Sequence, residues 1–357
     1  MKRIGNLYPY ICDEETLLKA IKKASKGKRK RRNVQKILAN KELYAHKLHV
    51  LLTTETFVPN DYKSEVKIEG TNRKKRDISK PNFYPDQIIH WAVYLAIRDW
   101  MHNSMYAHSC GSIPKRGPHY GKKYIEKWIR NDHKGTKYYF KMDVKKFYPS
   151  IPVDKLIEKL NRKIKDKRLM KLIVLILSKS DGLPIGMLLS QVFGNLYLSD
   201  LDFYIKQECH AEHLSRFADD IVVFGRSKRK LHKTRDAINK WLEVNGLQMK
   251  ENWQVCKLDK EPLDFMGFRF FRDHTILRKA LMFRITRKVH KVHKKRRFAT
   301  NGDASAVISY MGWIKCTDSY KMFVKRIKPY LHLGRLKAIV RRYQRENLQI
   351  QQHPATA

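Results

Sequence analysis

Negative charge is scarce in this 357-residue sequence: 34 Asp and Glu stand against 76 Lys and Arg, so the formal net charge is +42. A surplus of this size is costly self-repulsion unless a polyanion neutralises it, which disfavours small-molecule metabolism and favours a phosphate-rich partner. The sequence also has no apolar run of about 18 residues, and its first residues contain no apolar signal-peptide core. We therefore expect a cytoplasmic protein that does not enter a membrane.

Cysteine is also sparse. The five cysteines are scattered and none belongs to a CxxC pair, which excludes a disulfide scaffold and suits a reducing compartment. The nearest approach to metal-ligand spacing is Cys209-His210 with His213. No second ligand pair follows at zinc spacing, so we expect a polar loop at this place. No internal repeat is visible.

Apolar residues make up 42% of the chain, which is enough for a folded core. Before residue 138, periodicity predicts helices over 14–24, 34–52, 86–101 and 120–131, and a β-hairpin over 62–78 with its turn at 69–72. A basic stretch covers residues 22–32. It is either a solvated loop or an arm that contacts phosphates, and the overall charge favours an arm formed by Lys28, Arg29, Arg31 and Arg32.

Residues 138–280 change in character, toward short strands and buried helices. Strands are predicted over 138–144, 214–217 and 221–224, with 265–270 as the last strand pair of the same unit. Helices are expected over 153–165, 168–178, 188–208 and 230–245. A glycine-bearing loop at 181–186 leads into the third of these helices.

The C-terminal part, from about residue 281, is expected to be helical and is strongly basic. Residues 281–345 hold 18 Lys and Arg and only two acids. Such a run is either a solvated face or a folded helical unit that grips a nucleic-acid backbone. The interleaved aromatic residues favour the second interpretation. Its candidate phosphate contacts are Lys294, Lys295, Arg296 and Arg297.

Three carboxylates stand where a core should be apolar. Asp143 ends a hydrophobic strand, and the adjacent Asp219 and Asp220 lie between two hydrophobic strands, at the expected tip of a hairpin. Neighbouring acids raise one another's pKa unless cations occupy the site, and Mg²⁺ prefers hard oxygen ligands. The chemistry that needs this arrangement is two-metal phosphoryl transfer, in which catalysis is mostly positioning and charge neutralisation. An Asp-Asp pair alone can equally form a turn or cap a helix.

The combination of motifs resembles the palm of reverse transcriptases. Asp143 with Tyr148 is similar to the first palm motif, and Phe217-Ala218-Asp219-Asp220 to the aromatic-x-Asp-Asp motif, with Phe where Tyr is commoner. The resemblance implies that Asp143, Asp219, Asp220 and the backbone of Val144 hold two Mg²⁺ ions, with Mn²⁺ as a substitute. It also implies a primer grip at Phe265, Met266 and Gly267.

Further motifs of the same family concern the nucleotide. Lys75-Arg76-Asp77-Ile78 and Asp86-Gln87-Ile88-Ile89-His90 resemble fingers motifs of group II intron-like enzymes, so Lys75 or Arg76 is expected to hold the incoming triphosphate, unless the hairpin is merely solvated. The ring of Tyr148 would lie under the sugar and exclude a 2′-hydroxyl, which favours deoxynucleotides, although it could instead be a core aromatic. His108–Pro114 follows the usual fingers motif only loosely.

The glycine loop resembles one subclass most. Most reverse transcriptases carry Gln-Gly-x-x-x-Ser-Pro here, whereas this chain has Ile185-Gly186-Met187-Leu188-Leu189-Ser190-Gln191, similar to diversity-generating retroelement enzymes. That resemblance implies error-prone copying opposite template adenines. Apolar Ile185 replaces a hydrogen-bonding Gln and removes one source of discrimination, and Gln191 retains a backbone N–H that Pro lacks. Ile185, Gly186, Ser190 and Gln191 are therefore expected at the dNTP site.

The predicted fold class is α+β, a right-hand polymerase with fingers, an RRM-like palm (an antiparallel sheet plus helices) and a helical thumb. We expect a basic helical extension over 1–60, fingers over 61–137, palm over 138–280 with part of the fingers near 153–180, and thumb over 281–357. The implied partners are template RNA, RNA/DNA duplex, dNTPs and a small helical oligomeric accessory protein, in a bacterial cell or encoded by its phage. The alternatives are a retron-like or defence-associated reverse transcriptase, or an RNA-binding scaffold without catalysis.

Overall fold

The structure is a computed structural model that describes residues 3–69, 74–295 and 298–352. It divides into two compact units, one formed by residues 1–116 and 140–255 and the other by residues 117–139 and 256–357. Among the described residues no helix is both long enough and apolar enough to cross a bilayer. The divisions expected at residues 60, 137 and 280 stay a prediction.

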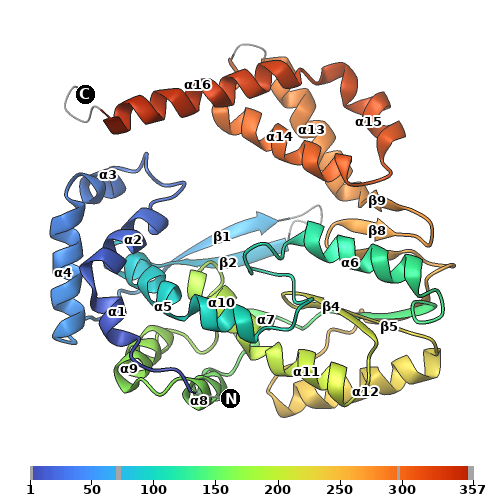
Figure 1. Cartoon of the computed structure of the whole chain (residues 1–357), viewed down its shortest axis with the longest axis horizontal. Coiled ribbons are helices and arrows are strands. Elements are labelled where there is room, and N and C mark those ends of the chain that lie inside the picture. The colour runs from blue at the N-terminus through green and yellow to red at the C-terminus, as the bar shows by residue number, and fades with distance from the viewer. Residues whose placement is uncertain (1–2, 70–73, 296–297, 353–357) are drawn as a thin grey trace. The chain divides into compact units, whose positions relative to one another are not determined.

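The first unit carries most of the helices and the largest sheet (Figure 1). Its elements are α1 (Tyr8–Cys12), α2 (Glu14–Ala24), α3 (Arg32–Ala39), α4 (Lys41–Thr53), β1 (Lys63–Glu69), β2 (Lys74–Lys80), the π-turn η1 (Phe83–Gln87), α5 (Ile88–Ser104), β3 (Tyr138–Met142), α7 (Phe147–Ser150), α8 (Val153–Lys163), α9 (Lys167–Leu177), α10 (Leu188–Tyr197), α11 (Ser199–Gln207), β4 (His213–Phe217), β5 (Asp220–Gly225), α12 (Lys228–Val244) and β6 (Gln254–Lys257).

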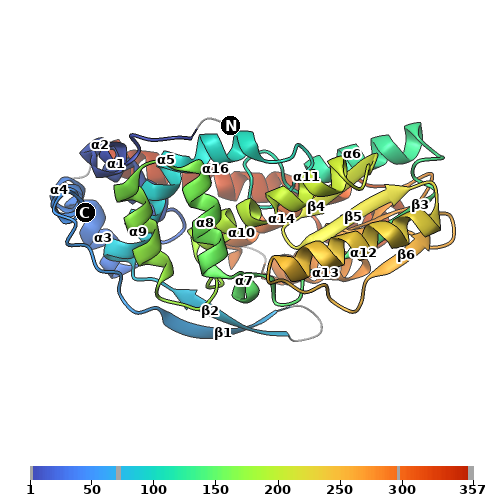
Figure 2. The ribbon, with the colours of Figure 1, turned by 90° about the horizontal axis from the view of Figure 1, so that it is seen from below.

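A four-stranded sheet of order β4-β5-β3-β6 supports the candidate site. Its β4 and β5 strands are antiparallel and pair Phe217 with Asp220, so that only residues 218 and 219 connect them. Helices α11 and α12 pack on this sheet and on each other, as Figure 1 and Figure 2 show. Buried apolar residues on β4 and β5, among them Leu214, Ile221 and Val223, form the core beneath these helices.

A second group of elements precedes the sheet in the sequence. Helix α5 is almost entirely apolar on its buried face, and α2 and α10 pack against it. The antiparallel hairpin β1-β2 pairs Lys67 with Arg76 and Ile68 with Lys75. Before α5, the buried carboxylate of Asp86 accepts hydrogen bonds from the backbone N–H and the side-chain amide of Asn60, at 3.1 and 3.0 Å. These bonds fix the segment that enters the hairpin.

Two helices that periodicity predicts as continuous are each broken. The 34–52 helix is interrupted at Asn40, which leaves the helical region (φ −128°, ψ 42°) and donates a side-chain hydrogen bond to the Lys36 carbonyl, a competition typical of Asn. The 188–208 helix divides at Leu198. There the ammonium of Lys159 donates a hydrogen bond to the carbonyl of Tyr197 at 2.9 Å. This carbonyl therefore has an acceptor role outside the helical hydrogen-bond pattern. Strand β6 was not predicted.

The second unit consists of α6 (Pro118–Asn131), β7 (Leu263–Phe265), β8 (Phe268–Phe270), β9 (Thr275–Leu277), α13 (Lys279–Lys295), α14 (Asn301–Lys315), α15 (Tyr320–Arg326), the 3-10 turn η3 (Lys328–Tyr330) and α16 (Leu333–Gln352). Residues 265–270 contain the predicted strand pair, since β7 and β8 pair across Phe265 and Phe268, but this pair does not join the four-stranded sheet. They belong to a separate three-stranded sheet, β7-β8-β9, within this unit. The sequence after Phe270 supplies its own third partner strand at 275–277, so the pair needs no edge of the larger sheet.

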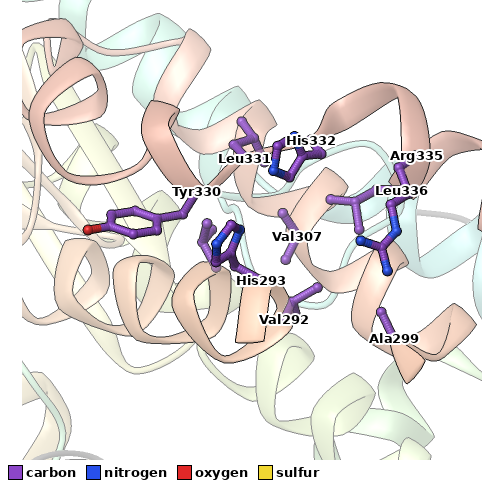
Figure 3. Close-up of a pocket in the computed structure, with 10 residues that line it drawn as sticks. Val292, His293, Ala299, Val307, Tyr330, Leu331, His332, Arg335 and Leu336 are labelled. Carbon is purple, nitrogen blue, oxygen red and sulfur yellow. The ribbon is translucent and has the colours of Figure 1, made fainter. Parts of the chain in front are cut away.

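Apolar side chains such as Phe268, Phe270, Ile285 and Val307 form the core of this unit, and stacked aromatic and histidine rings lie beside it. The rings of Phe268 and Trp313 stack with centroids 5.0 Å apart, and His119 lies 4.8 Å from Trp313. Among the helices, the rings of His293 and His332 stack at 5.6 Å (Figure 3). The cavity beside them is only about 20 Å³, room for about one water molecule. It is therefore a packing gap rather than a ligand pocket.

Candidate active site

Asp143 lies just beyond the end of β3 and is held by Lys250. The Lys250 ammonium is 2.9 Å from one carboxylate oxygen of Asp143, and the Lys250 backbone N–H donates to the Asp143 carbonyl, also at 2.9 Å. Val144 faces Met249 as a non-hydrogen-bonded antiparallel pair, which leaves its carbonyl out of this pairing. Sequence reasoning missed Lys250, because residue 250 is far from every acidic motif in the chain and meets Asp143 only through this pairing.

Asp219 and Asp220 lie at the connection between β4 and β5. Ala218, the first connecting residue, has a φ of +55°, the left-handed value that a two-residue hairpin requires at this position. Burial, followed by the negative charges of Asp143 and Asp220, raises the pKa of Asp219 well above its usual range. The structure thus brings together the three carboxylates that the sequence singled out, from two places about 75 residues apart.

The donor set fits divalent metal ions. One oxygen of Asp143 is buried and receives no hydrogen bond among the described residues. Mg²⁺ and Mn²⁺ prefer hard oxygen ligands, so Asp143, Asp219, Asp220 and the Val144 carbonyl could hold such ions.

Tyr148 forms one wall of this site. It lies in the short helix α7, half-buried, beside Phe147, whose ring centroid is 5.0 Å away. Gly194 of α10 leaves the space for both rings, since a Cβ there would lie 2.9 Å from Tyr148 and 3.2 Å from Phe147. Burial raises the pKa of Tyr148 to about 12, and the charge of Asp219 adds to the shift while Arg216 and Arg76 oppose it. The phenol therefore stays neutral and lies within electrostatic reach of the aspartate turn.

The glycine loop touches the fingers hairpin. The backbone N–H of Ser79 donates to the Ile185 carbonyl at 2.8 Å, and a Cβ on Gly186, whose φ is +107°, would lie 2.5 Å from the Ile78 side chain. Ser190 is buried in the first turn of α10. Gln191 is exposed and accepts a hydrogen bond from the Ser112 hydroxyl at 3.3 Å.

Lys75 and Arg76 are the two candidate ligands of the triphosphate, and their positions in the hairpin distinguish them. Lys75 and Arg76 are consecutive in β2 and so project from opposite faces. Lys75 is exposed, whereas Arg76 is half-buried and its positive charge acts on the Tyr148 phenol. Of the two residues, Arg76 therefore faces the site.

The family relationship follows from comparison with known proteins. Residues 70–270, more than half of the chain, match the family described as reverse transcriptase (RNA-dependent DNA polymerase), and the match spans all three aspartates. The chain belongs to this reverse transcriptase family. Its mixed helix-and-sheet architecture accords with the right-hand polymerase fold that the sequence predicted.

Relatives of this reverse transcriptase include the retron Ec73 reverse transcriptase of Escherichia coli, 23% identical over 297 residues, which cover 77% of this chain and 92% of that protein. An uncharacterized 91 kDa protein in the cob intron of Schizosaccharomyces pombe is 37% identical over 89 residues, 22% of this chain and 11% of that one.

Solved structures similar to this reverse transcriptase include telomerases. Apo telomerase from Candida tropicalis aligns with a TM-score of 0.45 and 13% identity over 63% of this chain and 49% of that one. Telomerase from Candida albicans with a fragment of telomeric RNA aligns with a TM-score of 0.46 and 10% identity, over 69% and 54% of the two chains. The reverse transcriptase thus spans about half the length of these telomerase chains.

The primer-grip residues of this reverse transcriptase form the turn between β7 and β8. Met266 and Gly267 have φ values of +52° and +89°, as a two-residue type I′ turn requires. The side chains of Phe265 and Met266 are buried, and Gly267 packs on Trp313. Contact with a primer at this turn would therefore be made by the backbone. The role itself stays a prediction.

The Lys and Arg residues predicted to contact nucleic acid differ in how exposed their side chains are. Lys28 is half-buried, hydrogen-bonds the side chain of Gln87 and lies over the Phe83 ring, so it has a structural role. Lys295 is ion-paired with Asp303 at 2.7 Å. Arg29, Arg31, Arg32 and Lys294 are exposed. Arg296 and Arg297, like most of the turn expected at 69–72, lie outside the described residues.

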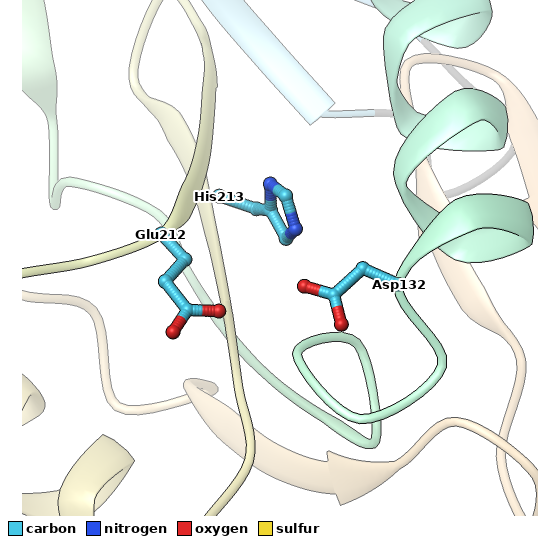
Figure 4. A group of neighbouring side chains, drawn as sticks. All are labelled: Asp132, Glu212 and His213. Carbon is cyan, nitrogen blue, oxygen red and sulfur yellow. The ribbon is translucent and has the colours of Figure 1, made fainter.

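Figure 4 draws three further side chains of metal-ligating type, Asp132, Glu212 and His213. Two have local roles: Asp132 accepts a hydrogen bond from the Gly135 backbone at 2.7 Å, and Glu212 pairs with Arg226 at 3.2 Å. The Cys209, His210 and His213 side chains do not gather as a ligand group in the described part of the chain. No zinc site is therefore assigned to this reverse transcriptase.

Proposed function

We propose that the protein is an RNA-directed DNA polymerase that extends a primer with dNTPs on an RNA template, using two Mg²⁺ ions. The observation that carries this proposal is the convergence of Asp143 and Asp219 on one half-buried site, where their carboxylates adjoin the ring of Tyr148. Family membership supports the same reaction.

In this proposal the chain's own residues mainly position the reactants. When bound, the metal ions would activate the primer hydroxyl and neutralise the pyrophosphate that leaves. Asp143, Asp219 and Asp220 hold them, Arg76 contacts the triphosphate of the nucleotide, and Tyr148 supports its sugar. Lys250 fixes the carboxylate of Asp143. Template RNA and the duplex would be contacted by the exposed cations of residues 29–32 and by Lys294.

The test is primer extension. Purified full-length protein, an RNA template with an annealed DNA primer, the four dNTPs and Mg²⁺ should give full-length cDNA, and the four NTPs should give far less product. An RNA-binding scaffold without catalysis would bind the template and extend nothing. Absence of extension with both Mg²⁺ and Mn²⁺, on a template that the protein demonstrably binds, would refute the proposal.

Arg76→Ala should raise the KM for dNTP by about 10- to 100-fold, since a hydrogen bond to a charged group contributes roughly 1.5–3 kcal/mol. Lys75→Ala is the matched control on the opposite face of the same strand. Because Lys75 is exposed, its removal should change KM by less than about twofold. Steady-state kinetics with varied dNTP would measure both. A larger effect of Lys75→Ala would show that the triphosphate lies on the other face.

We further propose that copying is error-prone opposite template adenines, as in a diversity-generating retroelement. Ile185 supports this, since its side chain offers no hydrogen bond at the place where most family members have Gln. Ile185→Gln should lower misincorporation opposite adenine by about two- to tenfold, the worth of one hydrogen bond. Sequencing of cDNA made by both proteins from one template would measure it, with errors opposite the other bases as internal control. Equal adenine error rates would contradict the proposal.

The second candidate is a retron-like reverse transcriptase, favoured by the retron Ec73 relative, which matches over 92% of its length. Uniformly low error rates in the wild-type cDNA would support it over the retroelement role. The retroelement proposal also predicts a small helical oligomeric accessory protein, whereas the retron-like proposal does not. Co-purification of the protein from a bacterial cytoplasm with its neighbouring gene products would distinguish the two.

A further inference from the structure

Arg216 is the largest fully buried side chain of the protein's described part. It lies on β4, two residues before Ala218, and its side chain and that of Asp202 on α11 are both 0% exposed. The guanidinium meets this carboxylate through two hydrogen bonds, from Nε at 2.7 Å and from Nη2 at 2.8 Å. A planar two-pronged contact of this kind fixes the orientation of the guanidinium as well as its position.

The remaining donors of Arg216 reach α10 and the aspartate turn. Nη2 also donates to the Asn195 carbonyl at 3.3 Å, and Nη1 donates to the Asn195 side-chain oxygen and to the Ala218 carbonyl, each at 3.0 Å. An Arg side chain has five N–H donors, and all five have an acceptor here. The one acceptor that belongs to the turn is the carbonyl directly before Asp219.

That turn needs support. Ala218 has a φ of +55°, which costs a non-glycine residue roughly 1–2 kcal/mol. On its other side lies Gly111, where a Cβ would be 2.7 Å from the Ala218 nitrogen. The Asn195 amide donates to the Gly111 carbonyl at 2.5 Å, and the Cys110 N–H donates to the Arg216 carbonyl at 2.7 Å. The turn is thus enclosed by Arg216 on one side and by the 108–111 segment on the other.

We propose that Arg216 is a positioning residue for the catalytic aspartates, with Asp202 and Asn195 orienting it. The inference rests on the proposed polymerase function. Arg216 holds the Ala218 carbonyl so that Asp219 and Asp220 are presented together in the geometry that the metal ions require. The His108–Pro114 segment follows the usual fingers motif only loosely. In this proposal it supports the aspartate turn from the side opposite to Arg216.

A purely structural ion pair would not need this arrangement. Buried salt bridges contribute little net stability, and apolar residues of similar volume often replace them without loss. What an apolar residue, or Lys, cannot do is donate at once to Asp202, Asn195 and Ala218, because a Lys ammonium has no planar fork. Charge alone would be conserved in Arg216→Lys, whereas the five-donor geometry would be lost.

The experiment compares Arg216→Lys with wild type in the full-length protein. We expect kcat for primer extension to fall at least tenfold, with the KM for dNTP and the affinity for template RNA within about twofold. Mn²⁺ binding without nucleotide, measured by electron paramagnetic resonance, should weaken by about tenfold. Arg272→Lys is the control, since Arg272 is also largely buried and bridges Asp259 and Thr136, but in the second unit. It should leave kcat and Mn²⁺ binding unchanged.

Gly111→Ala covers the case in which Arg216→Lys does not fold. It leaves the ion pair intact and presses on Ala218 from the opposite side, so it should weaken Mn²⁺ binding and kcat in the same way. Wild-type kcat and Mn²⁺ binding in Arg216→Lys, with only the unfolding temperature lowered, would overturn the proposal. If the wild type extends no primer, the polymerase function fails, and the Mn²⁺ titration alone still decides whether Arg216 positions the aspartates.

Discussion

Replacing both Asp219 and Asp220 by Asn should abolish dNTP incorporation while template RNA remains bound. The double substitution keeps the shape of the turn and removes two of the three carboxylates that are proposed to hold the metal ions. Metal ions stabilise the transition state of such reactions by several kcal/mol, and about 1.36 kcal/mol corresponds to a factor of ten in rate. We therefore expect a loss on the order of 10³-fold or more.

Primer extension over a range of Mg²⁺ concentrations measures this effect, and filter binding of labelled template RNA provides the control. RNA affinity should stay nearly constant, because it depends on Lys and Arg contacts with phosphates outside the turn. Extension at the wild-type rate would exclude these two residues from catalysis. Loss of RNA binding together with extension would indicate instead that the variant is misfolded.

Tyr148→Ala should admit ribonucleotides. In the proposed function the wild-type ring fills the space of a 2′-hydroxyl, and forcing extra atoms into a filled space costs about 1–3 kcal/mol. Removing the ring should lower the preference for dNTP over NTP by about 10- to 100-fold. The measurement is the ratio of kcat/KM for a dNTP and for the matching NTP.

Tyr148→Phe is the matched variant for this test. It keeps the ring against Gly194 and removes only the phenol oxygen, so discrimination should remain close to wild type. If Tyr148→Phe loses discrimination as strongly as Tyr148→Ala, a hydrogen bond of the phenol, and not the bulk of the ring, selects the sugar. If neither variant changes the ratio, Tyr148 is a core aromatic.

Local patterns in the sequence sufficed to predict the strands around Asp143 and Asp219. The signals for a strand, a short run of β-favouring residues bounded by turn residues, extend over only a few positions. They could not distinguish Lys75 from Arg76, since consecutive strand residues point to opposite faces and only the paired hairpin shows which face meets the palm. Lys250 escaped for a similar reason. Its link to Asp143 is a pairing between segments more than 100 residues apart.

Arg216 shows a different limit. No local sequence pattern predicts the hydrogen-bond partners of a single Arg inside a hydrophobic strand. The partners of Arg216 come from α10, α11 and the turn itself. The separate sheet of residues 263–277 was missed because its strands are only three residues long and their alternation fits either sheet.

The contact between the fingers hairpin and the glycine loop has a mechanical consequence. The Ser79–Ile185 hydrogen bond and the packing of Gly186 on Ile78 join two segments that the chain separates by about 100 residues. Any displacement of the hairpin that carries Arg76 must therefore displace the loop that carries Ile185. With the roles proposed for Arg76 and Ile185, a substitution that loosens this contact is therefore expected to change both the affinity for dNTP and the accuracy of copying.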